Sequence, residues 1–405
     1  LSVFSNLNLF ANKPKKQYLS QQKKVFDKLR ALIYSTNKAP WGGSEIVWKD
    51  ICIELNKQNV SILASNYKHP SKEVHYEELR ALGISVQTRG SFNYPFSENI
   101  TDLIKSYTGV VNDAVLNRYW REIKTFNPDI IIINAGEAFE FDLLSIHSAL
   151  RRVNLIRKPM YLVVHFCVDQ FLNLSQKEFE GYVRLYSLAT KVIFVSEANK
   201  NTVTRILGVG TENFTLLSGQ VPPNKKKYST PILNNKHLNL AIVARLEHEI
   251  KGQDIAIEYL SKYERKNEIV LNVYGKGPSK NYLESLTSFY NLSNQINFKN
   301  HVEDKSEIWK SNEMLLAFSQ AEGLPLSLLE AMAHGRSFLS TTAGGVQNIP
   351  DNLGYTFHPT NRTYFYHLLD NLLDNRGTIT EKGIDCHSWS LNQSVKTYYN
   401  QFFGQ

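Results

Sequence analysis

Short apolar runs alternate with longer amphipathic segments along most of this chain, and this alternation limits the possible folds more than any other feature. The runs are rich in β-branched and aromatic residues, as parallel strands separated by covering helices are. The first series of expected strands is 31–35, 60–64, 130–133, 161–165 and 192–196. The second series is 238–244, 270–274, 296–298, 314–318 and 337–340. The sequence therefore predicts an α/β protein with parallel sheets.

A stretch without periodicity separates the two series. It carries Pro222, Pro223 and Pro231, three consecutive lysines and several asparagines, which are typical of a linker. We therefore expect two doubly wound parallel-sheet domains with a cleft between them. Their expected bounds are residues 31–218 and 237–385, joined by a linker at 219–236.

Charge is concentrated at the start of the chain. The 405 residues have a formal net charge of +8, and residues 1–30 alone contribute +6 of it. This predicts a basic leader on a nearly neutral body, and the leader has no aromatic platform of the kind that binds DNA or RNA. Tyr18, Val25, Phe26 and Leu29 recur at helical spacing. The leader is thus either an amphipathic helix on an anionic membrane or a solvated helix packed on the body.

Cellular location is constrained by what the sequence lacks. No apolar run approaches the ~18 residues that a membrane-spanning helix needs, so a soluble protein is expected. Cys52, Cys167 and Cys386 match no metal or redox spacing, which favours a reducing cytoplasm, with the inner face of the membrane as an alternative position. The chain begins at Leu1 and shows no signal peptide, so we expect an excerpt of a longer protein.

Ligands of open parallel sheets bind beyond the carboxyl ends of the strands. Gly42 and Gly43 follow the first strand and precede a helix, where backbone amides can approach a phosphate or sugar, although a tight turn explains them equally well. Arg245 and Lys251 follow the first strand of the second series. These two cations could clamp a diphosphate, or they could be an ordinary charged surface loop.

The segment 321–333, AEGLPLSLLEAMA, is the most specific of the chain. Pro325 suits a first helical turn, and Glu322 lies just before it, beside backbone amides that can face a phosphate. Glu330 lies inside an otherwise apolar helix, so its carboxylate needs a partner. The two hydroxyls of a ribose would serve, and so would a neighbouring arginine or backbone donor.

Taken in order, these elements resemble the retaining glycosyltransferases of family 4, also called glycosyl transferases group 1. The resemblance covers roughly residues 31–400 and is strongest over 238–350. It is carried by Gly42, Gly43, Arg245, Lys251, Gly275, Glu322, Glu330, Gly344 and Gly345. It implies the GT-B fold, in which two Rossmann-like domains face each other across a deep cleft. Residues 386–405 resemble the terminal helix that crosses back to the first domain in this fold.

The resemblance also implies roles for single residues. Arg245 and Lys251 would grip the diphosphate of a nucleotide sugar, Glu322 would face the donor sugar, and Glu330 would bind the ribose. Gly43 would approach the diphosphate from the opposite domain. The full set expected to bind the donor is Gly42, Gly43, Gly275, Gly277, Gly323, Leu324, Glu330, Gly344 and Gly345.

The other wall of the cleft has fewer signals. His165 ends an apolar strand where many family members place a histidine near the reacting centre, although a structural histidine is an equally good interpretation. With Glu322, Arg245 and Lys251 it completes the expected catalytic set. Asn134, Glu137 and Asp169 end neighbouring strands and are expected on the acceptor side.

These residues predict a retaining glycosyltransferase that uses a UDP- or GDP-linked sugar and a glycan or lipid-linked acceptor, in the synthesis of a surface polysaccharide or glycoconjugate. No Asp-x-Asp motif is present, so neither a metal nor another cofactor is expected. Ser218-Gly219 replaces a frequent Asn-Gly of the family before the linker. Gln347-Asn348 replaces a frequent Pro-Glu in the loop expected beside the donor phosphates and sugar, which leaves the donor sugar open. A nucleotide-sugar epimerase and a noncatalytic nucleotide-sugar binding module are the alternatives.

Overall fold

The computed structural model describes residues 28–90, 118–167, 172–208, 212–217, 236–300, 302, 304–323, 325–392 and 398–403. Most of the expected leader and linker, and the site candidates Asp169 and Leu324, lie outside the described residues. None of the helices in the described part of the chain combines the length and apolar composition needed to cross a bilayer.

The first domain is built on a seven-stranded sheet in the order β3-β2-β1-β4-β5-β6-β7, in which every neighbouring pair is parallel. Its strands are β1 (Arg30–Ser35), β2 (Ser61–Tyr67), β3 (Ser85–Arg89), β4 (Ile130–Ala135), β5 (Met160–Val164), β6 (Lys191–Phe194) and β7 (Phe214–Leu216). Its helices are α1 (Gly43–Lys57), α2 (Glu73–Ala81), α4 (Arg118–Phe126), α5 (Phe141–Arg152), α6 (Gln176–Leu188) and α7 (Glu197–Leu207), with a 3-10 turn η2 (Pro70–Lys72) before α2.

The central strand β4 shows why the sequence forms a two-sided sheet. Ile131 and Ile133 pack into the core on one face, whereas Ile130 and Ile132 pack into the core on the other. A strand covered by helices on both faces is apolar at every position, so an unbroken run of isoleucines replaces the alternation of a half-exposed strand.

The second domain contains a six-stranded parallel sheet in the order β10-β9-β8-β11-β12-β13. Its strands are β8 (Leu238–Val243), β9 (Ile269–Tyr274), β10 (Ile296–Lys299), β11 (Met314–Ala317), β12 (Ser337–Thr341) and β13 (Tyr355–Phe357). Its helices are α8 (His248–Lys251), α9 (Gln253–Ser261), α10 (Lys280–Phe289), α11 (Lys305–Ser311), α12 (Leu326–Ala333), α13 (Arg362–Asp374) and α14 (Arg376–Asn392), with short 3-10 turns that include η5 (Gly344–Asn348).

The expected fold class is confirmed, and all ten expected strands are present. The strands β3, β7 and β13 were not expected from the sequence. β3 is an edge strand with the mostly polar sequence SVQTR, and β7 and β13 have three residues each, too few to show a period. β1 begins at Arg30, inside the expected leader, where Arg30 forms an ion pair with Asp129 at 3.2 Å.

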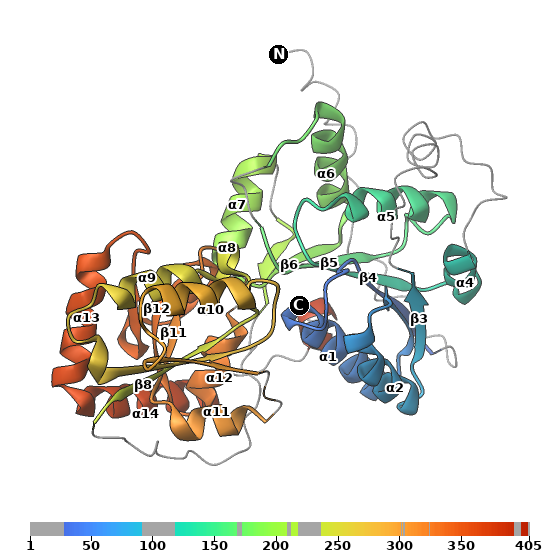
Figure 1. Cartoon of the computed structure of the whole chain (residues 1–405). Helices are drawn as coiled ribbons and strands as arrows, with labels where there is room; N and C mark the ends of the chain where they lie inside the picture. The colour runs from blue at the N-terminus through green and yellow to red at the C-terminus, as the bar shows by residue number, and fades with distance from the viewer. Residues whose placement is uncertain are drawn as a thin grey trace.

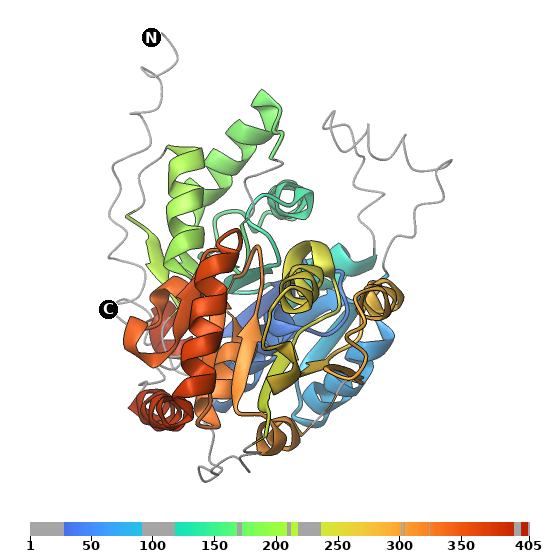
Figure 2. The same ribbon diagram turned by 60° about the vertical axis from the view of Figure 1, so that its left-hand side comes forward.

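The two domains lie side by side, with the helices of each wrapped around its own sheet (Figure 1; Figure 2). The chain returns to the first domain at its end. α14 remains on the second domain, where Cys386 is fully buried in its core. The short helix α15 (Tyr398–Phe403) packs on α1, and Phe402 contacts Tyr161 of β5 with 5.5 Å between ring centroids.

Candidate functional site

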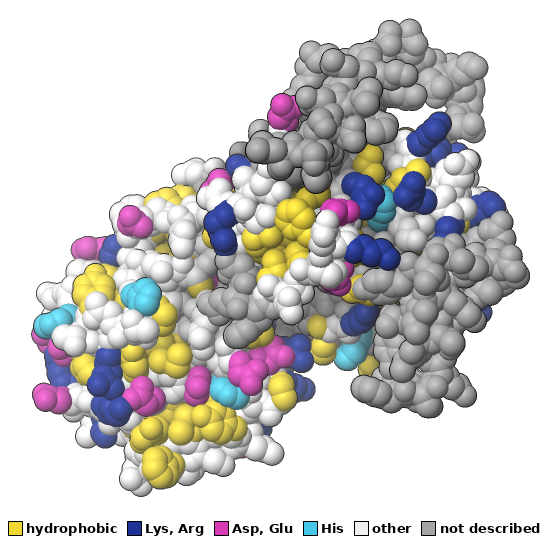
Figure 3. All heavy atoms as spheres, turned by 90° about the horizontal axis from the view of Figure 1, so that it is seen from above, with side chains coloured by type: hydrophobic (Ala, Val, Ile, Leu, Met, Phe, Trp, Pro, Cys, Tyr) yellow, Lys and Arg dark blue, Asp and Glu magenta, His cyan; other side chains and the backbone are white. Residues whose placement is uncertain are grey.

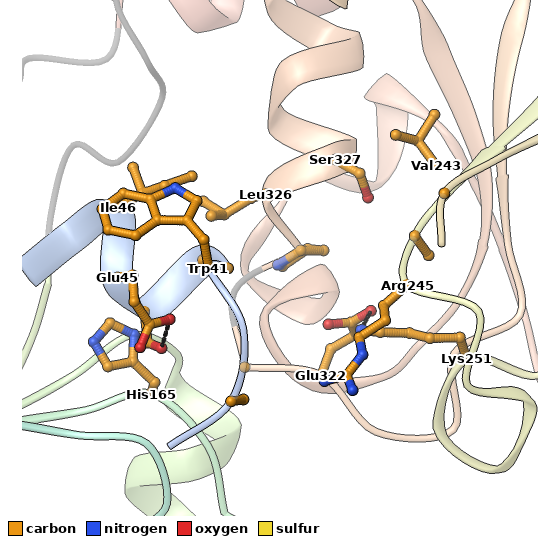
Figure 4. A pocket seen from close by; sticks show the side chains of 18 of the residues that line it. Trp41, Glu45, Ile46, His165, Val243, Arg245, Lys251, Glu322, Leu326 and Ser327 are labelled. Atoms are coloured by element: carbon orange, nitrogen blue, oxygen red, sulfur yellow. Dashed lines mark hydrogen bonds and ion pairs between the residues drawn. The ribbon is translucent and has the colours of Figure 1, made fainter. Parts of the chain in front are cut away.

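A cleft of about 1510 Å³ separates the two domains and receives residues from both. The loop after β1 and the start of α1 form one wall, and the loops after β8, β9 and β11 form the other (Figure 4). Ligand pockets typically measure about 300–1,000 Å³, so this cleft has room for more than one small molecule.

Three of the expected catalytic residues meet on the wall of the second domain. Lys251, at the end of α8, forms an ion pair with Glu322 in which Nζ lies 2.7 Å from Oε1. Ser319 Oγ donates to the same carboxylate oxygen at 2.7 Å. Arg245 points toward the same place in Figure 4 and pairs with Glu247 at 3.1 Å. Both cations are therefore already paired with carboxylates of their own domain.

Glu330 lines the cleft from the helix α12, whose other residues are mostly buried. Its carboxylate has no hydrogen-bond or ion-pair partner among the described residues. Burial raises the pKa of Glu330, and the nearby Lys305 ammonium opposes that rise. The sequence allowed an arginine or a backbone donor as the partner of Glu330, but none in the described part of the chain contacts its carboxylate.

The turn η5 (Gly344–Asn348) closes the cleft beside Glu322. Gly344 has a φ of +53°, and a Cβ on it would lie 1.9 Å from the carbonyl oxygen of Glu322, so the position requires glycine. The amide of Gly345 donates to the carbonyl oxygen of Gly323 at 2.8 Å. Gly275 and Gly277 line the cleft after β9. Gly275, Gly277 and Gly323 thus border one cleft, whereas Gly344 and Gly345 pack behind Glu322 and are not among the residues that line it.

On the first domain, Gly42 and Gly43 also border the cleft. Gly42 is the N-cap of α1, so the free amides of the first turn begin here. Gly43 lies against the second domain, because a Cβ built on it would stand 2.8 Å from Leu326 Cδ1. The Trp41 ring stacks on His75 with 3.6 Å between centroids, and both side chains line the cleft.

His165 follows β5 and faces Asn134. Its Nε2 lies 2.8 Å from Asn134 Oδ1, and Asn134 Nδ2 donates to the carbonyl oxygen of Ser44. This orientation of the amide requires His165 Nε2 to carry the proton, which leaves Nδ1 as an acceptor. Burial lowers the pKa of His165 to about 3, so the ring is neutral. Asn134 is fully buried and supports His165 rather than exposing its amide to the cleft.

Two carboxylates line the same wall below α5. Glu137 was expected there from the sequence, and burial raises its pKa. Glu140 was not expected. It pairs with Thr36 Oγ1, and burial raises its pKa to about 7. Both residues follow β4 and lie three positions apart in the turn that precedes α5, where no helical or strand period marks Glu140 as a site residue.

The structure also contains a buried ion pair between Glu45 and Lys72 that the sequence did not predict. Both side chains are fully buried behind the loop that carries Gly42 and Gly43, with Nζ 3.2 Å from Oε1. Glu45 is visible as an acidic residue in a first helical turn. Its partner comes from a separate element 27 residues later, so no local pattern points to it.

No group of three or more His, Cys, Asp or Glu side chains is arranged to hold a metal ion in the described part of the chain.

Two parallel-sheet α/β domains that face each other across a cleft define the GT-B fold. Residues 224–388 match the family model described as Glycosyl transferases group 1. The resemblance to group 1 glycosyltransferases that the sequence indicated is confirmed.

Similar proteins extend the match beyond the second domain. An uncharacterized glycosyltransferase of Haemophilus influenzae is 25% identical over 348 residues, which cover 82% of this chain and 87% of that protein. The chain spans 33% to 50% of the length of three further curated relatives.

The solved structure of Anabaena Alr3699/HepE in complex with UDP has a TM-score of 0.68 at 16% identity and covers 92% of this chain and 98% of its own. The apo lipopolysaccharide outer core galactosyltransferase WaaB has a TM-score of 0.67 at 16% identity, covering 93% of this chain and 99% of its own. Both have the fold described above.

Proposed function

We propose that this protein is a retaining glycosyltransferase that moves a sugar from a nucleotide-sugar donor to a glycan or lipid-linked acceptor without a metal ion. One observation carries the proposal. Arg245, Lys251, Glu322 and Glu330 come from separate loops and helices of the second domain, yet all four line one cleft opposite Gly43 of the first domain. This is the arrangement that the group 1 resemblance implies for a nucleotide sugar.

The two cations are proposed to hold the diphosphate. Glycosyl transfer builds negative charge on the leaving diphosphate, and preorganised donors in a water-excluding cleft stabilise that charge. Lys251 is held in place by Glu322, and the exposed Arg245 can exchange its ion pair with Glu247 for a phosphate. These residues supply the positive charge that a metal ion supplies in other transferases.

The two glutamates are proposed to hold the sugars of the donor. Glu330 is a half-buried carboxylate without a partner among the described residues, and a ribose offers two adjacent hydroxyl donors for it. Glu322 already accepts hydrogen bonds from Lys251 and Ser319 through Oε1, which leaves Oε2 for a hydroxyl of the transferred sugar.

A same-face reaction fits the neutral histidine. In that scheme the departing phosphate takes the proton of the acceptor hydroxyl, so no protein base is required. With its proton on Nε2 and shared with Asn134, His165 can only accept through Nδ1. It is therefore proposed to orient a hydroxyl of the donor sugar rather than to act as an acid.

The solved neighbours support particular substrate classes. Alr3699/HepE was crystallised with UDP and with UDP-glucose, which favours a uridine diphosphate sugar as the first donor to test. WaaB is a lipopolysaccharide outer core galactosyltransferase, which supports a surface glycan as acceptor. We also propose a cytoplasmic location with membrane contact through residues 1–30. Basic side chains gather on the first-domain half of the face shown in Figure 3, which supports an acidic partner on that side.

A thermal-shift series with UDP, GDP, ADP and their sugars tests the proposal. A ligand present at a hundred times its dissociation constant stabilises a protein by about 2.7 kcal/mol, so the correct nucleotide should raise the melting temperature visibly. The chosen donor is then incubated with acceptor glycans. No stabilisation by any nucleotide would contradict the proposed donor site, and binding without transfer or hydrolysis would contradict the enzymatic function.

A further inference from the structure

A buried ion pair lies directly behind the turn that is proposed to face the diphosphate. Glu45 belongs to the first turn of α1, and Lys72 ends the 3-10 turn η2 before α2. Both side chains are 0% exposed, and Nζ lies 3.2 Å from Oε1. The pair therefore ties the helix that follows Gly42 and Gly43 to a separate element of the domain.

The hydrogen bonds around the pair are those of an ammonium and a carboxylate. Lys72 Nζ contacts Glu45 Oε1, the carbonyl oxygen of Asn37 at 2.9 Å and Asn66 Oδ1 at 3.2 Å. These three acceptors match the three N–H groups of an ammonium. Glu45 Oε2 accepts from Asn37 Nδ2 at 2.8 Å and from Ser44 Oγ at 2.9 Å, as a carboxylate does.

Burial acts against both charges, and each charge sustains the other. Desolvation raises the pKa of Glu45, and the Lys72 ammonium opposes that rise. Desolvation likewise lowers the pKa of Lys72, and the Glu45 carboxylate opposes that change. Removal of either partner would leave the other charge buried and uncompensated.

The position of the pair gives it an electrostatic consequence for the cleft. The first turn of α1 carries unpaired backbone amides and the positive end of the helix dipole, which favour an anion. A carboxylate in that same turn has the opposite effect and repels an anion. Asn37, Ser44 and Glu45 all line the cleft, so the charge of Glu45 acts on any ligand bound at Gly42 and Gly43.

We propose that Lys72 and Glu45 are positioning residues for the donor diphosphate. The Lys72 ammonium balances the charge of the Glu45 carboxylate, so the turn at Gly42 and Gly43 can receive an anion. The hydrogen bonds that Glu45 accepts from Asn37 and Ser44 hold that turn in its conformation. The proposal rests on the proposed function and assigns a source of donor affinity on the first domain.

Charge variants test it because their effects on UDP binding have opposite signs. Glu45→Gln leaves the Lys72 cation uncompensated, so UDP should bind about tenfold more tightly, the order of magnitude expected for one unit charge near a bound anion at an effective dielectric constant of about 20. Lys72→Met leaves the Glu45 anion, so UDP should bind about tenfold more weakly. The double variant is neutral and should return the dissociation constant close to that of the wild type.

Uridine distinguishes this effect from a structural one, because it lacks the diphosphate. Calorimetric titration should show the same dissociation constant for uridine in all four proteins. A purely structural role would weaken UDP and uridine together in each variant. If Lys72→Met does not fold, the tighter binding by Glu45→Gln and the recovery in the double variant still decide the question.

Lys57→Met and Glu77→Gln are the matched controls. They change the same charges on exposed positions of α1 and α2 and should leave both dissociation constants unchanged. UDP binding that is unchanged or weakened in Glu45→Gln would overturn the proposal, provided the wild type binds UDP more tightly than uridine. A wild type that does not prefer UDP would overturn the diphosphate site itself, and this inference with it.

Discussion

The backbone of Gly323 lies against the carbonyl oxygen of His165, across the boundary between the two domains. A Cβ built on Gly323 would stand 1.9 Å from that oxygen, closer than any two such atoms approach. Gly323 belongs to the loop that carries Glu322, and His165 follows the end of β5 beside the cleft. The approach of these two backbones sets the distance between the proposed donor site and the first domain.

Gly323→Ala should disrupt this contact. The obstructing atom is a backbone carbonyl oxygen, which cannot turn aside as a side chain can, so the two domains must separate. We expect activity to fall by about tenfold or more with little change in the stability of either domain. Gly377→Ala on α14 meets no atom within 4 Å and is the control. Equal activity in the two variants would show that the contact is dispensable.

Arg245→Ala and Lys251→Ala should each lower the turnover number about a hundredfold, the loss typical when one donor to a developing anion is removed. Steady-state kinetics with the donor identified by thermal shift measures it. Lys280→Ala, on the exposed surface of α10, removes the same charge outside the cleft and should be nearly silent. Near-normal turnover in both cleft variants would reject the phosphate clamp.

Glu330→Gln should weaken UDP binding by about tenfold, since a hydrogen bond to a charged group contributes about 1.5–3 kcal/mol. The same loss should follow when the wild type is given 2′-deoxy-UDP instead of UDP. If Glu330 binds the ribose, the variant and the altered ligand remove one interaction, and their effects should not add. Additive losses would place Glu330 away from the 2′-hydroxyl.

Lys72→Met should lower the free energy of unfolding by about 3–5 kcal/mol, because it leaves the Glu45 carboxylate buried without its counter-ion. Lys49→Met breaks an ion pair between α1 and the half-exposed Glu78 of α2, and should cost less than about 1 kcal/mol. Urea denaturation of both variants measures the difference. A loss in Lys72→Met as small as that of Lys49→Met would contradict an ionised buried pair.

His165 should make the protein sensitive to mild acid. Its folded-state pKa of about 3 lies below the unfolded value of about 6.5, so the unfolded chain binds a proton that the native state refuses. Stability is unaffected above about pH 6.5 and falls as the pH drops toward 3, by roughly 1–2 kcal/mol at pH 5. His165→Gln should reduce this loss, and His358→Gln at an exposed position should not. An unchanged acid slope in His165→Gln would indicate a solvated imidazole.

Most of the strands could be predicted from local sequence patterns. Parallel strands covered on both sides must be apolar throughout, so the run at 130–133 and the other short apolar runs predicted both sheets. The edge strand β3 and the three-residue strands β7 and β13 could not be predicted from the sequence, because they are too polar or too short to show an apolar run. The glycine pairs and the segment around Glu322 were visible because the backbone geometry they require restricts the residue type at each position.

The chain sequence thus determined two α/β domains, the residue types at the strand ends and the resemblance to group 1 glycosyltransferases. Only the tertiary structure decided that Lys251 pairs with Glu322, that Asn134 sets the tautomer of His165, and that Lys72 lies behind Glu45. The physical reason is the separation along the chain over which each kind of interaction acts. Periodicity and turn chemistry act between neighbours in the chain, whereas these contacts join residues 27 to 71 positions apart, which only the packed sheets bring together.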